Sequence, residues 1–371
     1  MNMKKVKVGV VGCGAISNAY FNGAKNFPIL EMAAVADLDM DRARAKAAEH
    51  GVARACTVEE LLGDPGIEIV LNLTVPQAHV PVALAALSAG KHTYAEKPLG
   101  VDRQGGREVL ELAKKKGLRV GCAPDTVLGS GLQTARKLVD DGVIGRPVGF
   151  TALMLSPGHE SWHPSPEFYY RAGGGPMFDM GPYYLTALLN LFGPVRRVMG
   201  MASIAIAERT ITSEPKRGKK IAVETPDHVM GLMEFENGVS GALLTSFATK
   251  FKTYDEKQPI TVYGSEGTIR VPDPNMFDGP VHVKTVGDAD WREAPAAFAT
   301  GYSRATGLAD MAYAIRSGRK MRCDVSQAFV VLDLMQGFLD SSRNGSEFVT
   351  EIVYERPAAM PRDLAFGVLD E

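Results

Sequence analysis

The sequence predicts an α/β protein of two domains, in which a doubly wound parallel sheet is followed by an α/β domain with a mostly antiparallel, open sheet. At 371 residues the chain is too long for one ordinary hydrophobic core. Strand-like and helix-like segments alternate as far as Pro124, the pattern of a parallel sheet covered on both faces. Beyond Pro124, β signals joined by short turns predominate. We therefore expect domains at 1–124 and 125–371.

The composition indicates a soluble globular protein that acts on a small molecule. Hydrophobic residues make up 45% of the chain and charged residues 23%. A net charge of −2, without basic runs between aromatic residues, argues against nucleic-acid and membrane partners. The four cysteines lack the spacing of a disulfide framework or a zinc site, so no metal is expected. With an N-terminal apolar stretch too short for a signal peptide, we expect a reduced, cytoplasmic setting.

A glycine-containing turn near the N-terminus predicts a nucleotide site. An apolar, β-branched run at 5–11 leads into Gly12-Cys13-Gly14-Ala15-Ile16-Ser17, and a helical pattern continues to about residue 25. Gly12 permits the tight turn, Gly14 lets the backbone approach a pyrophosphate, and the helix N-terminus offers N–H groups to the anion. Ser17 stands where a third glycine is usual. The predicted cofactor contacts of this turn are Gly12, Gly14, Ala15 and Ile16.

The second strand, 30–36, ends at Asp37, about 20 residues beyond the glycine turn, where an acid that binds the adenosine ribose is expected. Such a carboxylate repels a 2′-phosphate, so NAD is favoured over NADP. The alternative is that Asp37 only caps the following helix, a role equally open to Asp39 and Asp41. Binding of NADP is the less favoured alternative, because two basic side chains follow Asp37 in the sequence: Arg42 and Arg44.

Lys97 is the first candidate for the chemistry. It follows the strand 92–95 and precedes Pro98, which has no N–H to give to a sheet, so its side chain should point into the crevice at the strand ends. The alternative is a solvated pair of Glu96 and Lys97 on a strand leaving the sheet. Further candidate cofactor contacts at strand ends are Thr74, Pro76, His79, Glu96 and Lys97. For His79, packing against the next helix is the alternative.

The remaining elements of the first half are predicted as helices 39–50, 58–62, 79–89 and 103–116, and strands 68–73, 92–95 and 118–122. In the second half we expect helices 131–141, 308–317 and 325–342, and strands 148–155, 195–207, 229–235, 238–246, 260–263, 268–271 and 281–286. The charged segment 208–220 is predicted to be an exposed, mobile loop.

A second cluster of candidates lies in the second half. Three glycines at 173–175 precede Asp179 and Tyr183, and an apolar helix continues to Phe192. Because Asp179 and Tyr183 are four residues apart, they share one face once the helix has begun. An acid and a phenol on one face near a lysine could handle a proton. The alternative is an N-cap role for Asp179 and a core role for Tyr183 and Tyr184.

The segment 158–164 gathers polar and aromatic side chains suited to binding a polyol by hydrogen bonds and ring stacking. A metal site formed by His159, Glu160 and His163 is a weaker alternative, since proline and tryptophan break the helical spacing that such sites need. The candidate substrate contacts are Lys97, Asp125, Trp162, His163, Tyr169, Asp179, Tyr183 and Tyr184; for the pocket candidates Asp125, Trp162, His163, Tyr169 and Tyr184, core or surface roles are the alternative.

Taken together, the glycine turn, Asp37, Glu96-Lys97-Pro98 and the segment 173–184 resemble the glucose-fructose oxidoreductase / inositol dehydrogenase / MocA (Gfo/Idh/MocA) family. The resemblance covers most of the chain. It implies an N-terminal NAD(P)-binding Rossmann domain and a C-terminal domain for substrate binding and oligomerisation. It also implies a homodimer or homotetramer formed through an exposed sheet face.

The resemblance further implies roles for single residues. Lys97 would be the catalytic lysine, and Asp179 the acid of the catalytic segment. Tyr183 stands where most members have histidine, although glucose-fructose oxidoreductase has tyrosine, and Thr186 replaces an acid found in many members. Proton transfer by a phenol whose pKa is lowered by Lys97 is therefore expected in place of an Asp–His pair.

The sequence thus predicts an NAD(P)-dependent dehydrogenase or reductase. It would transfer a hydride between nicotinamide and a carbinol or carbonyl of a sugar, sugar derivative or cyclic polyol, with Lys97, Asp179 and Tyr183 handling the proton. One alternative is a sugar–sugar oxidoreductase that retains its nucleotide. Another is a catalytically silent regulatory protein that binds NAD or a sugar.

Overall fold

The computed structural model describes residues 3–252, 254–350, 352–362 and 364–370. Within these ranges the chain forms two compact units, the first drawn from 1–133, 297–332 and 357–371 and the second from 134–296 and 333–356. This division differs from a single boundary after Pro124. The chain returns to the first unit because α9 (Thr306–Ser317), an apolar helix, packs against α1 and β6.

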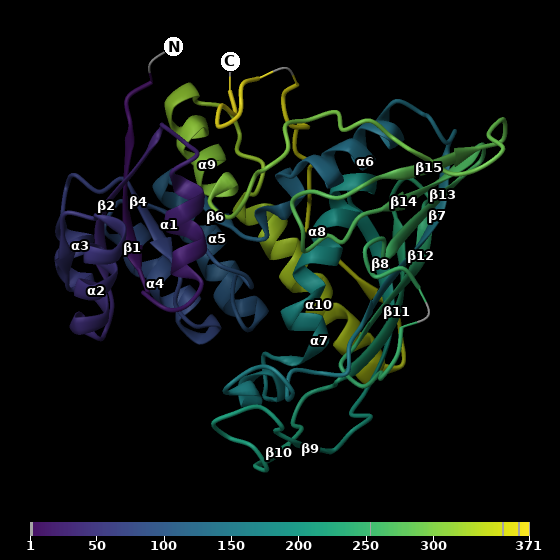
Figure 1. Ribbon diagram of the computed structural model, residues 1–371, viewed down its shortest axis with the longest axis horizontal. Coiled ribbons are helices and arrows are strands. Elements are labelled where there is room, and N and C mark those ends of the chain that lie inside the picture. The colour runs from purple at the N-terminus through teal and green to yellow at the C-terminus, as the bar shows by residue number, and fades with distance from the viewer. Residues whose placement is uncertain (1–2, 253, 351, 363, 371) are drawn as a thin grey trace. The chain divides into compact units, whose positions relative to one another are not determined.

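The first unit contains a parallel sheet of six strands in the described ranges, in the order β3-β2-β1-β4-β5-β6 (Figure 1). Its strands are β1 (Val6–Val11), β2 (Leu30–Ala36), β3 (Ala55–Cys56), β4 (Ile69–Asn72), β5 (His92–Ala95) and β6 (Val120–Cys122). Its connecting helices are α1 (Ser17–Ala24), α2 (Met40–His50), α3 (Val58–Gly63), α4 (Pro76–Ser88) and α5 (Arg103–Lys116). The strand order reverses between β1 and β4, which places a ligand crevice at their carboxyl ends.

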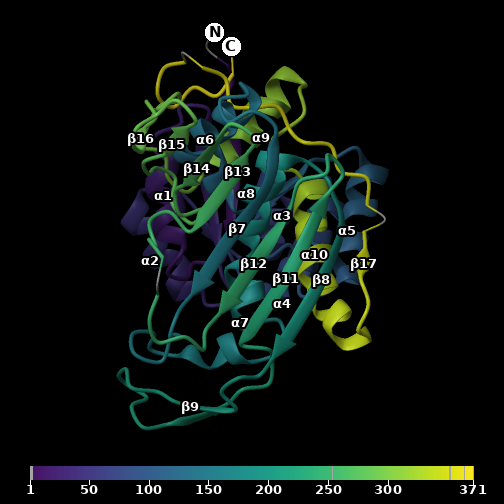
Figure 2. The same cartoon turned by 90° about the vertical axis from the view of Figure 1, so that its right-hand side faces the viewer.

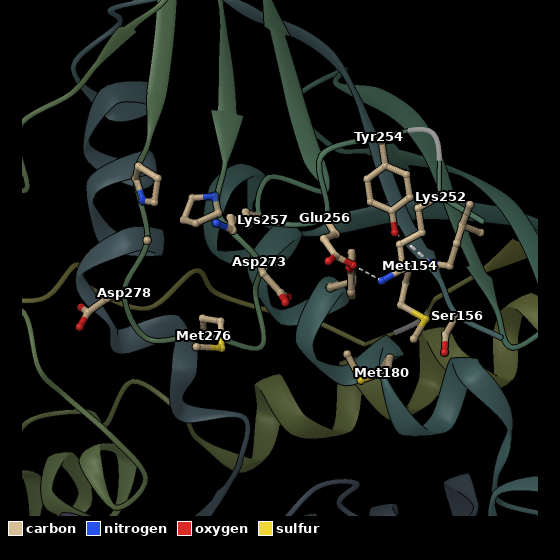
Figure 3. A pocket seen from close by; sticks show the side chains of 15 residues that line it. Met154, Ser156, Met180, Lys252, Tyr254, Glu256, Lys257, Asp273, Met276 and Asp278 are labelled. Carbon is tan, nitrogen blue, oxygen red and sulfur yellow. Dashed lines mark hydrogen bonds and ion pairs between the residues drawn. The ribbon is translucent and has the colours of Figure 1, made fainter. Parts of the chain in front are cut away.

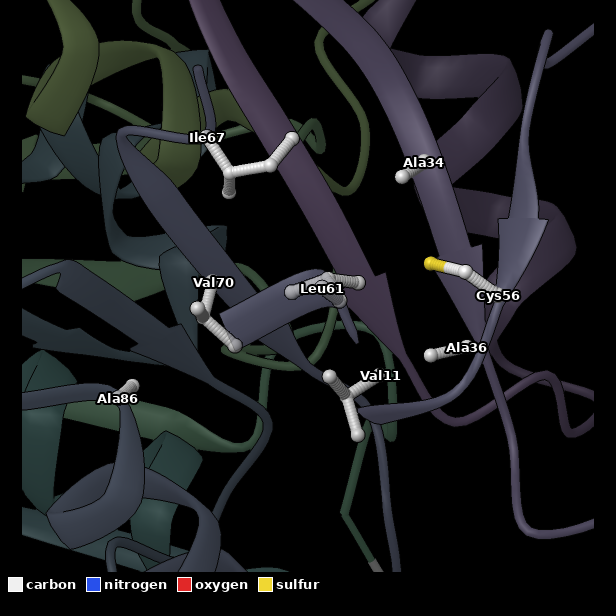
Figure 4. Packing of buried hydrophobic residues seen from close by; sticks show 8 residues of the cluster. All are labelled: Val11, Ala34, Ala36, Cys56, Leu61, Ile67, Val70 and Ala86. Atoms are coloured by element: carbon white, nitrogen blue, oxygen red, sulfur yellow. The ribbon is translucent and has the colours of Figure 1, made fainter. Parts of the chain in front are cut away.

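One hydrophobic cluster of this unit forms around Leu61 of α3, which is fully buried (Figure 4). A Cβ on Gly9 of β1 would lie 2.8 Å from Leu61 Cδ2, so glycine at this position lets α3 approach the sheet. Both faces of the central strands are covered, which explains their near-continuous apolar sequences. The cluster consists of Val11, Ala34, Ala36, Cys56, Leu61, Ile67, Val70 and Ala86.

The second unit contains a sheet of nine strands among the described residues, in the order β16-β15-β14-β13-β7-β12-β11-β8-β17. Within this part of the chain, β7 and β12 pair in parallel and the other neighbours are antiparallel. The strands are β7 (Pro147–Leu155), β8 (Val195–Ser203), β11 (His228–Phe235), β12 (Ser240–Ser246), β13 (Ile260–Gly264), β14 (Gly267–Val271), β15 (His282–Thr285), β16 (Arg292–Glu293) and β17 (Phe348–Val349). The predicted fold class is confirmed.

Helix α8 (Gly181–Phe192) is buried along its whole length. Helix α10 (Val325–Asn344) is divided between the two units after Leu332, and its second part, which belongs to the second unit, packs on β8 and β11. A Cβ on Gly200 would lie 2.2 Å from the carbonyl oxygen of Phe338, so a side chain there would collide with the α10 backbone. The remaining helices are α6 (Ser130–Asp140) and the short α7 (Gly175–Asp179), and single 3₁₀ turns lie at Asp125–Leu128 and Pro166–Tyr170. No helix in the described ranges has the length and hydrophobicity needed to cross a bilayer.

The prediction that 208–220 is a loop without regular structure was wrong at both ends. β9 (Glu208–Thr210) pairs with β10 (Lys220–Ala222) in an antiparallel arm. Isolated apolar residues among the charges explain this, because Ile211 and Ile221 are buried against Tyr170 and Phe247. The buried residue within β9 is Arg209 and that within β10 is Ile221, while Ile211 directly follows β9.

One face of the large sheet carries exposed apolar residues on the adjacent strands β8 and β11. Figure 2 shows these strands beside β12 and β7, facing the viewer. Met201 lies opposite Met230, and Met199 opposite Leu232. These four side chains belong to residues that are 46–75% exposed. Glu234, which follows on the same face of β11, accepts from Arg197 Nε at 2.6 Å.

Candidate functional site

The glycine turn after β1 has the geometry of a phosphate-binding turn. Gly12 has φ of +98°, and a Cβ there would lie 2.7 Å from the backbone of Leu73 after β4. A Cβ on Gly14 would meet nothing within 4 Å, so open space lies above this residue. Helix α1 begins after Ile16 without a side-chain cap. The N–H groups of Ser17 and Ala19 donate to the carbonyl oxygens of Gly14 and Ile16, at 3.1 and 3.0 Å. The positive end of the helix dipole at this turn favours an anion.

Cys13 lies between these glycines, but its thiol is not a candidate nucleophile. Burial, and secondly the Asp37 carboxylate, raise the pKa of the Cys13 thiol to about 11. Its contribution is the backbone N–H, which donates to Asp37 Oδ2 at 2.8 Å. The turn and the end of β2 are thereby tied together.

Asp37 does not cap helix α2. The cap is Asp39, whose side chain accepts from the N–H groups of Asp41 and Arg42. Asp37 instead accepts from the N–H groups of Cys13 and Asp39, at 2.8 and 2.9 Å, so its carboxylate is fixed beside the glycine turn. Arg42 Nη1 lies 3.7 Å from Asp37 Oδ1. These contacts fit the predicted ribose-binding position.

The segments after β4 and β5 are joined through His79. Its Nδ1 lies 2.6 Å from the carbonyl oxygen of Pro98, and its Nε2 lies 3.1 Å from that of Thr74. His79 is buried, and burial lowers the pKa of its imidazole. These contacts fit the packing role of His79, and its contact with the cofactor stays a prediction. Pro76 is the first residue of α4, a position where its missing N–H costs nothing.

Glu96 and Lys97 are not a solvated pair, because the Glu96 side chain is buried in the unit. Tyr20 Oη donates to Glu96 Oε1 at 2.8 Å, and the Lys97 N–H donates to Glu96 Oε2 at 3.0 Å. Burial, and secondly the Glu96 charge, keep the pKa of Tyr20 well above its ordinary value, so the phenol stays a donor. Glu96 therefore shapes the backbone at Lys97. Tyr20 was not identified from the sequence as a partner of Glu96.

Asp125 has contacts that fit a structural role better than the predicted contact with substrate. Its side chain is fully buried, and Oδ1 lies 3.2 Å from Arg304 Nη1. Oδ2 accepts from the N–H of Gly307 at 3.1 Å. Burial still raises the pKa of Asp125, and Arg304 opposes that rise. The carboxylate joins the 3₁₀ turn after β6 to α9.

In the second unit, Asp179 is the last residue of α7, and α8 begins at Gly181. The N-cap of α8 is Met180, so the alternative in which Asp179 caps the helix is not observed. Met180 keeps right-handed helical dihedral angles, which leaves Tyr183 about one turn beyond Asp179. Tyr183 is 5% exposed. Lys97 belongs to the first unit, and Asp179 and Tyr183 belong to the second.

The predicted aromatic segment forms a cluster beside Asp179. His159 stacks on Tyr169 with ring centroids 3.7 Å apart, and its Nε2 lies 3.5 Å from Asp179 Oδ2. Trp162 is 61% exposed and stands next to His163, whose pKa is lowered first by burial and then by His159. In the described residues no group of His, Cys, Asp and Glu side chains has the arrangement of a metal site.

A buried ion network fastens this cluster to the β9–β10 arm. Arg209 Nη1 lies 2.8 Å from Glu160 Oε1, and Arg209 Nη2 lies 2.7 Å from Asp227 Oδ2. The guanidinium also lies over the ring of Tyr170. Glu160, a member of the metal alternative, thus binds arginine.

A pocket of about 540 Å³ opens beside this site in the second unit (Figure 3). Met180 and Tyr184 line it, and each directly follows one of the candidate residues Asp179 and Tyr183. Tyr184 Oη donates to the carbonyl oxygen of Leu153, and burial keeps the pKa of Tyr184 well above its ordinary value. Burial also raises the pKa of Asp273 on the pocket wall. The pocket thus has thioether, phenol and carboxyl groups within reach of a ligand.

Comparisons with known proteins agree with this geometry. Residues 6–123 match an oxidoreductase family with an NAD-binding Rossmann fold, and residues 132–270 match the GFO/IDH/MocA C-terminal domain. Over 266 residues the chain is 30% identical to the 1,5-anhydro-D-fructose reductase of Ensifer adhaerens. The matched region covers 70% of this chain and 74% of the relative.

Two solved structures share the fold. An NAD binding oxidoreductase from Klebsiella pneumoniae has a TM-score of 0.82 at 21% identity, covering 95% of this chain and all of the other. Levoglucosan dehydrogenase in complex with NADH and levoglucosan has a TM-score of 0.80 at 21% identity. This match covers 94% of this chain and all of the dehydrogenase chain. The prediction of an NAD-binding Rossmann domain is confirmed by the family match. The chain belongs to the Gfo/Idh/MocA family of oxidoreductases.

Proposed function

We propose that this protein is an NAD-dependent dehydrogenase or reductase of a sugar, sugar derivative or cyclic polyol, with Lys97, Asp179 and Tyr183 handling the proton. The observation that carries the proposal is the glycine turn beside a fixed Asp37 carboxylate in the first unit. The second unit adds support by itself, because it holds an acid and a phenol about one helical turn apart. The 30% identical relative is named as a reductase of 1,5-anhydro-D-fructose, which supports a carbohydrate substrate.

The residues of the first unit fit the cofactor. The glycine turn and the positive end of the α1 dipole would hold its pyrophosphate, and Asp37 would accept from the adenosine ribose hydroxyls. Thr74 would line the nicotinamide end. When bound, the nicotinamide supplies or accepts a hydride.

The proton follows a separate route through side chains of this chain. In the direction of oxidation, Tyr183 Oη or Lys97 Nζ takes the hydroxyl proton of the substrate as its carbinol carbon loses hydride. The Lys97 cation stabilises the negative charge that develops on the oxygen. Asp179 orients its neighbours and keeps negative charge in the site. In reduction the same groups return the proton to the carbonyl oxygen.

Trp162, His163 and Tyr169 would bind the sugar by stacking and hydrogen bonds. Trp162 is exposed and suits the apolar face of a sugar ring, and His163 and Tyr169 are partly buried beside it. Tyr184 would contribute through the adjoining pocket. We leave Asp125 out of this set because its carboxylate already binds Arg304.

We also propose a homodimer or homotetramer. The occupant of the apolar sheet face would be a second copy of this chain, because the face carries both an apolar centre and, in Arg197 and Glu234, paired charges of both signs. A two-fold axis would bring opposite charges of the two copies together.

The first experiment is a fluorescence titration of the purified protein with NADH and, separately, with NADPH. We expect micromolar binding of NADH and at least about tenfold weaker binding of NADPH, because Asp37 repels a 2′-phosphate. Asp37→Ala should remove that preference while keeping NADH binding. Tighter binding of NADPH would overturn the role of Asp37, and a protein that neither binds nor co-purifies with nucleotide would overturn the function.

The second step is a panel of levoglucosan, myo-inositol and 1,5-anhydro-D-fructose with the appropriate nucleotide. Turnover of one of them supports the proposal. A nucleotide that co-purifies and passes hydride between two sugars would indicate the sugar–sugar alternative. Nucleotide binding without hydride exchange on any sugar would indicate the regulatory alternative.

A further inference from the structure

His159 is held beside Asp179 by its ring and by its backbone. The residue is only 7% exposed. Its imidazole stacks on Tyr169, with centroids 3.7 Å apart and planes 11° apart, and meets the ring of Phe247 edge-on at 4.5 Å. Its N–H donates to Tyr170 Oη at 3.1 Å, and its carbonyl oxygen accepts from the N–H of His163 at 3.0 Å. The ring has little freedom to turn.

This fixed ring presents Nε2 to Asp179. The distance from Nε2 to Asp179 Oδ2 is 3.5 Å. At this distance the Nε2 edge of the imidazole faces the Asp179 carboxylate. That edge can donate a hydrogen bond only if Nε2 carries a proton.

The other ring nitrogen indicates which tautomer is present. Nδ1 of His159 is buried and has no hydrogen-bond partner among the residues that the structure describes. A buried N–H without an acceptor costs more than a buried lone pair, so the proton is disfavoured at Nδ1. A neutral imidazole then carries its proton at Nε2, on the side of Asp179.

We propose that His159 is a positioning residue that donates from Nε2 to Asp179 and fixes the carboxylate for its part in the proton transfer. This proposal rests on the proposed function. The loop that contains His159 lies 20 residues before Asp179 in the sequence, so the pair arises only from the fold. His159 does not touch the reacting atoms in this role, since it acts through Asp179.

Two substitutions separate donation from packing. His159→Phe keeps a flat ring that can stack on Tyr169 but has no donor. His159→Gln loses the ring and can place an amide N–H near the position of Nε2. If stacking alone mattered, Phe would be the milder change, whereas the proposal makes Gln the milder one.

We expect His159→Phe to lower kcat by about 10- to 100-fold, because a misplaced catalytic group loses its alignment. The Kd for NADH and the melting temperature should stay close to those of the wild type. His159→Gln should retain kcat within about threefold, which is the rescue by a conservative donor. The substrate is the member of the sugar panel that the wild type turns over fastest. A kcat for His159→Phe equal to that of the wild type would overturn the proposal.

A spectroscopic test does not depend on activity. With ¹⁵N-labelled histidine, the signals missing from the spectrum of His159→Gln identify His159. We expect the Nε2–H tautomer, and Asp179→Asn should shift the Nε2 resonance. An Nδ1–H tautomer, or no response to Asp179→Asn, would overturn the proposal. If the wild type turns over no sugar, the proposed function fails, and this spectrum alone decides the role of His159.

Discussion

At the scale of single residues, Lys97 carries the most specific expectation. Its backbone is fixed by Glu96, which in turn is held by Tyr20, so its side chain leaves β5 from a defined position. Two side chains of the first unit, Glu96 and Tyr20, thus fix the backbone that carries one cation. A cation that stabilises a developing oxyanion acts mainly on kcat.

We therefore predict that Lys97→Ala lowers kcat by about 100-fold or more, on the scale of other oxyanion stabilisers. NADH binding, measured by fluorescence titration, should change little, because the glycine turn and Asp37 are untouched. Lys97→Arg keeps the positive charge and should fall between the wild type and Lys97→Ala. Turnover at the wild-type rate in Lys97→Ala would remove Lys97 from the chemistry.

Residue-level contacts were only partly predictable from the sequence. Asp37 could be singled out because it follows a strand about 20 residues beyond the glycine turn, and Asp179 because it follows three glycines and lies four residues before Tyr183. Their roles in the site stay predictions. His159 and Tyr20 could not be assigned, since their partners are 20 and 76 residues away and no periodic pattern links them. The contacts of Asp125 with Arg304 and Gly307 could not be predicted either, because these partners lie about 180 residues further along the chain.

At the scale of elements, the first unit followed its sequence closely. The strand predicted at 30–36 coincides with β2, whose last three residues are buried and apolar. Helix α4 begins at Pro76, three residues before the predicted start, because proline is favoured in a first turn. The β9–β10 arm was missed, since the buried positions within its two short strands are one arginine and one isoleucine among charges.

The packing of α3 on this sheet gives a prediction about stability. Leu61→Ala should lower the free energy of unfolding by about 3–5 kcal/mol, because Leu61 is fully buried and its removal leaves a cavity. Leu38→Ala is the matched control, because Leu38 is 99% exposed. This substitution should change the free energy of unfolding by less than about 0.5 kcal/mol. Scanning calorimetry measures both variants. Equal melting temperatures for the two would contradict the assignment of Leu61 to the core.

At the scale of the whole molecule, the apolar sheet face determines the expected assembly. Its exposed methionines and Leu232 stand on neighbouring strands in register, so they form one continuous patch instead of scattered single residues. A contiguous apolar patch with a polar rim is typical of a surface that binds another protein. Arg197 and Glu234 beside the patch carry opposite charges, so the same patch on a second copy of the chain could pair with it.

Sedimentation velocity at micromolar concentration should therefore give a mass of two or four times 39.8 kDa for the wild type. Leu232→Glu places a charge at the centre of the patch, where association would bury it without a partner, so this variant should sediment as a monomer. Leu38→Glu adds the same charge at an exposed position of the first unit and should leave the assembly intact. A monomeric wild type would contradict the proposed homo-oligomer. If Leu232→Glu sediments like the wild type, the copies associate through another surface, and the apolar face then needs a different occupant.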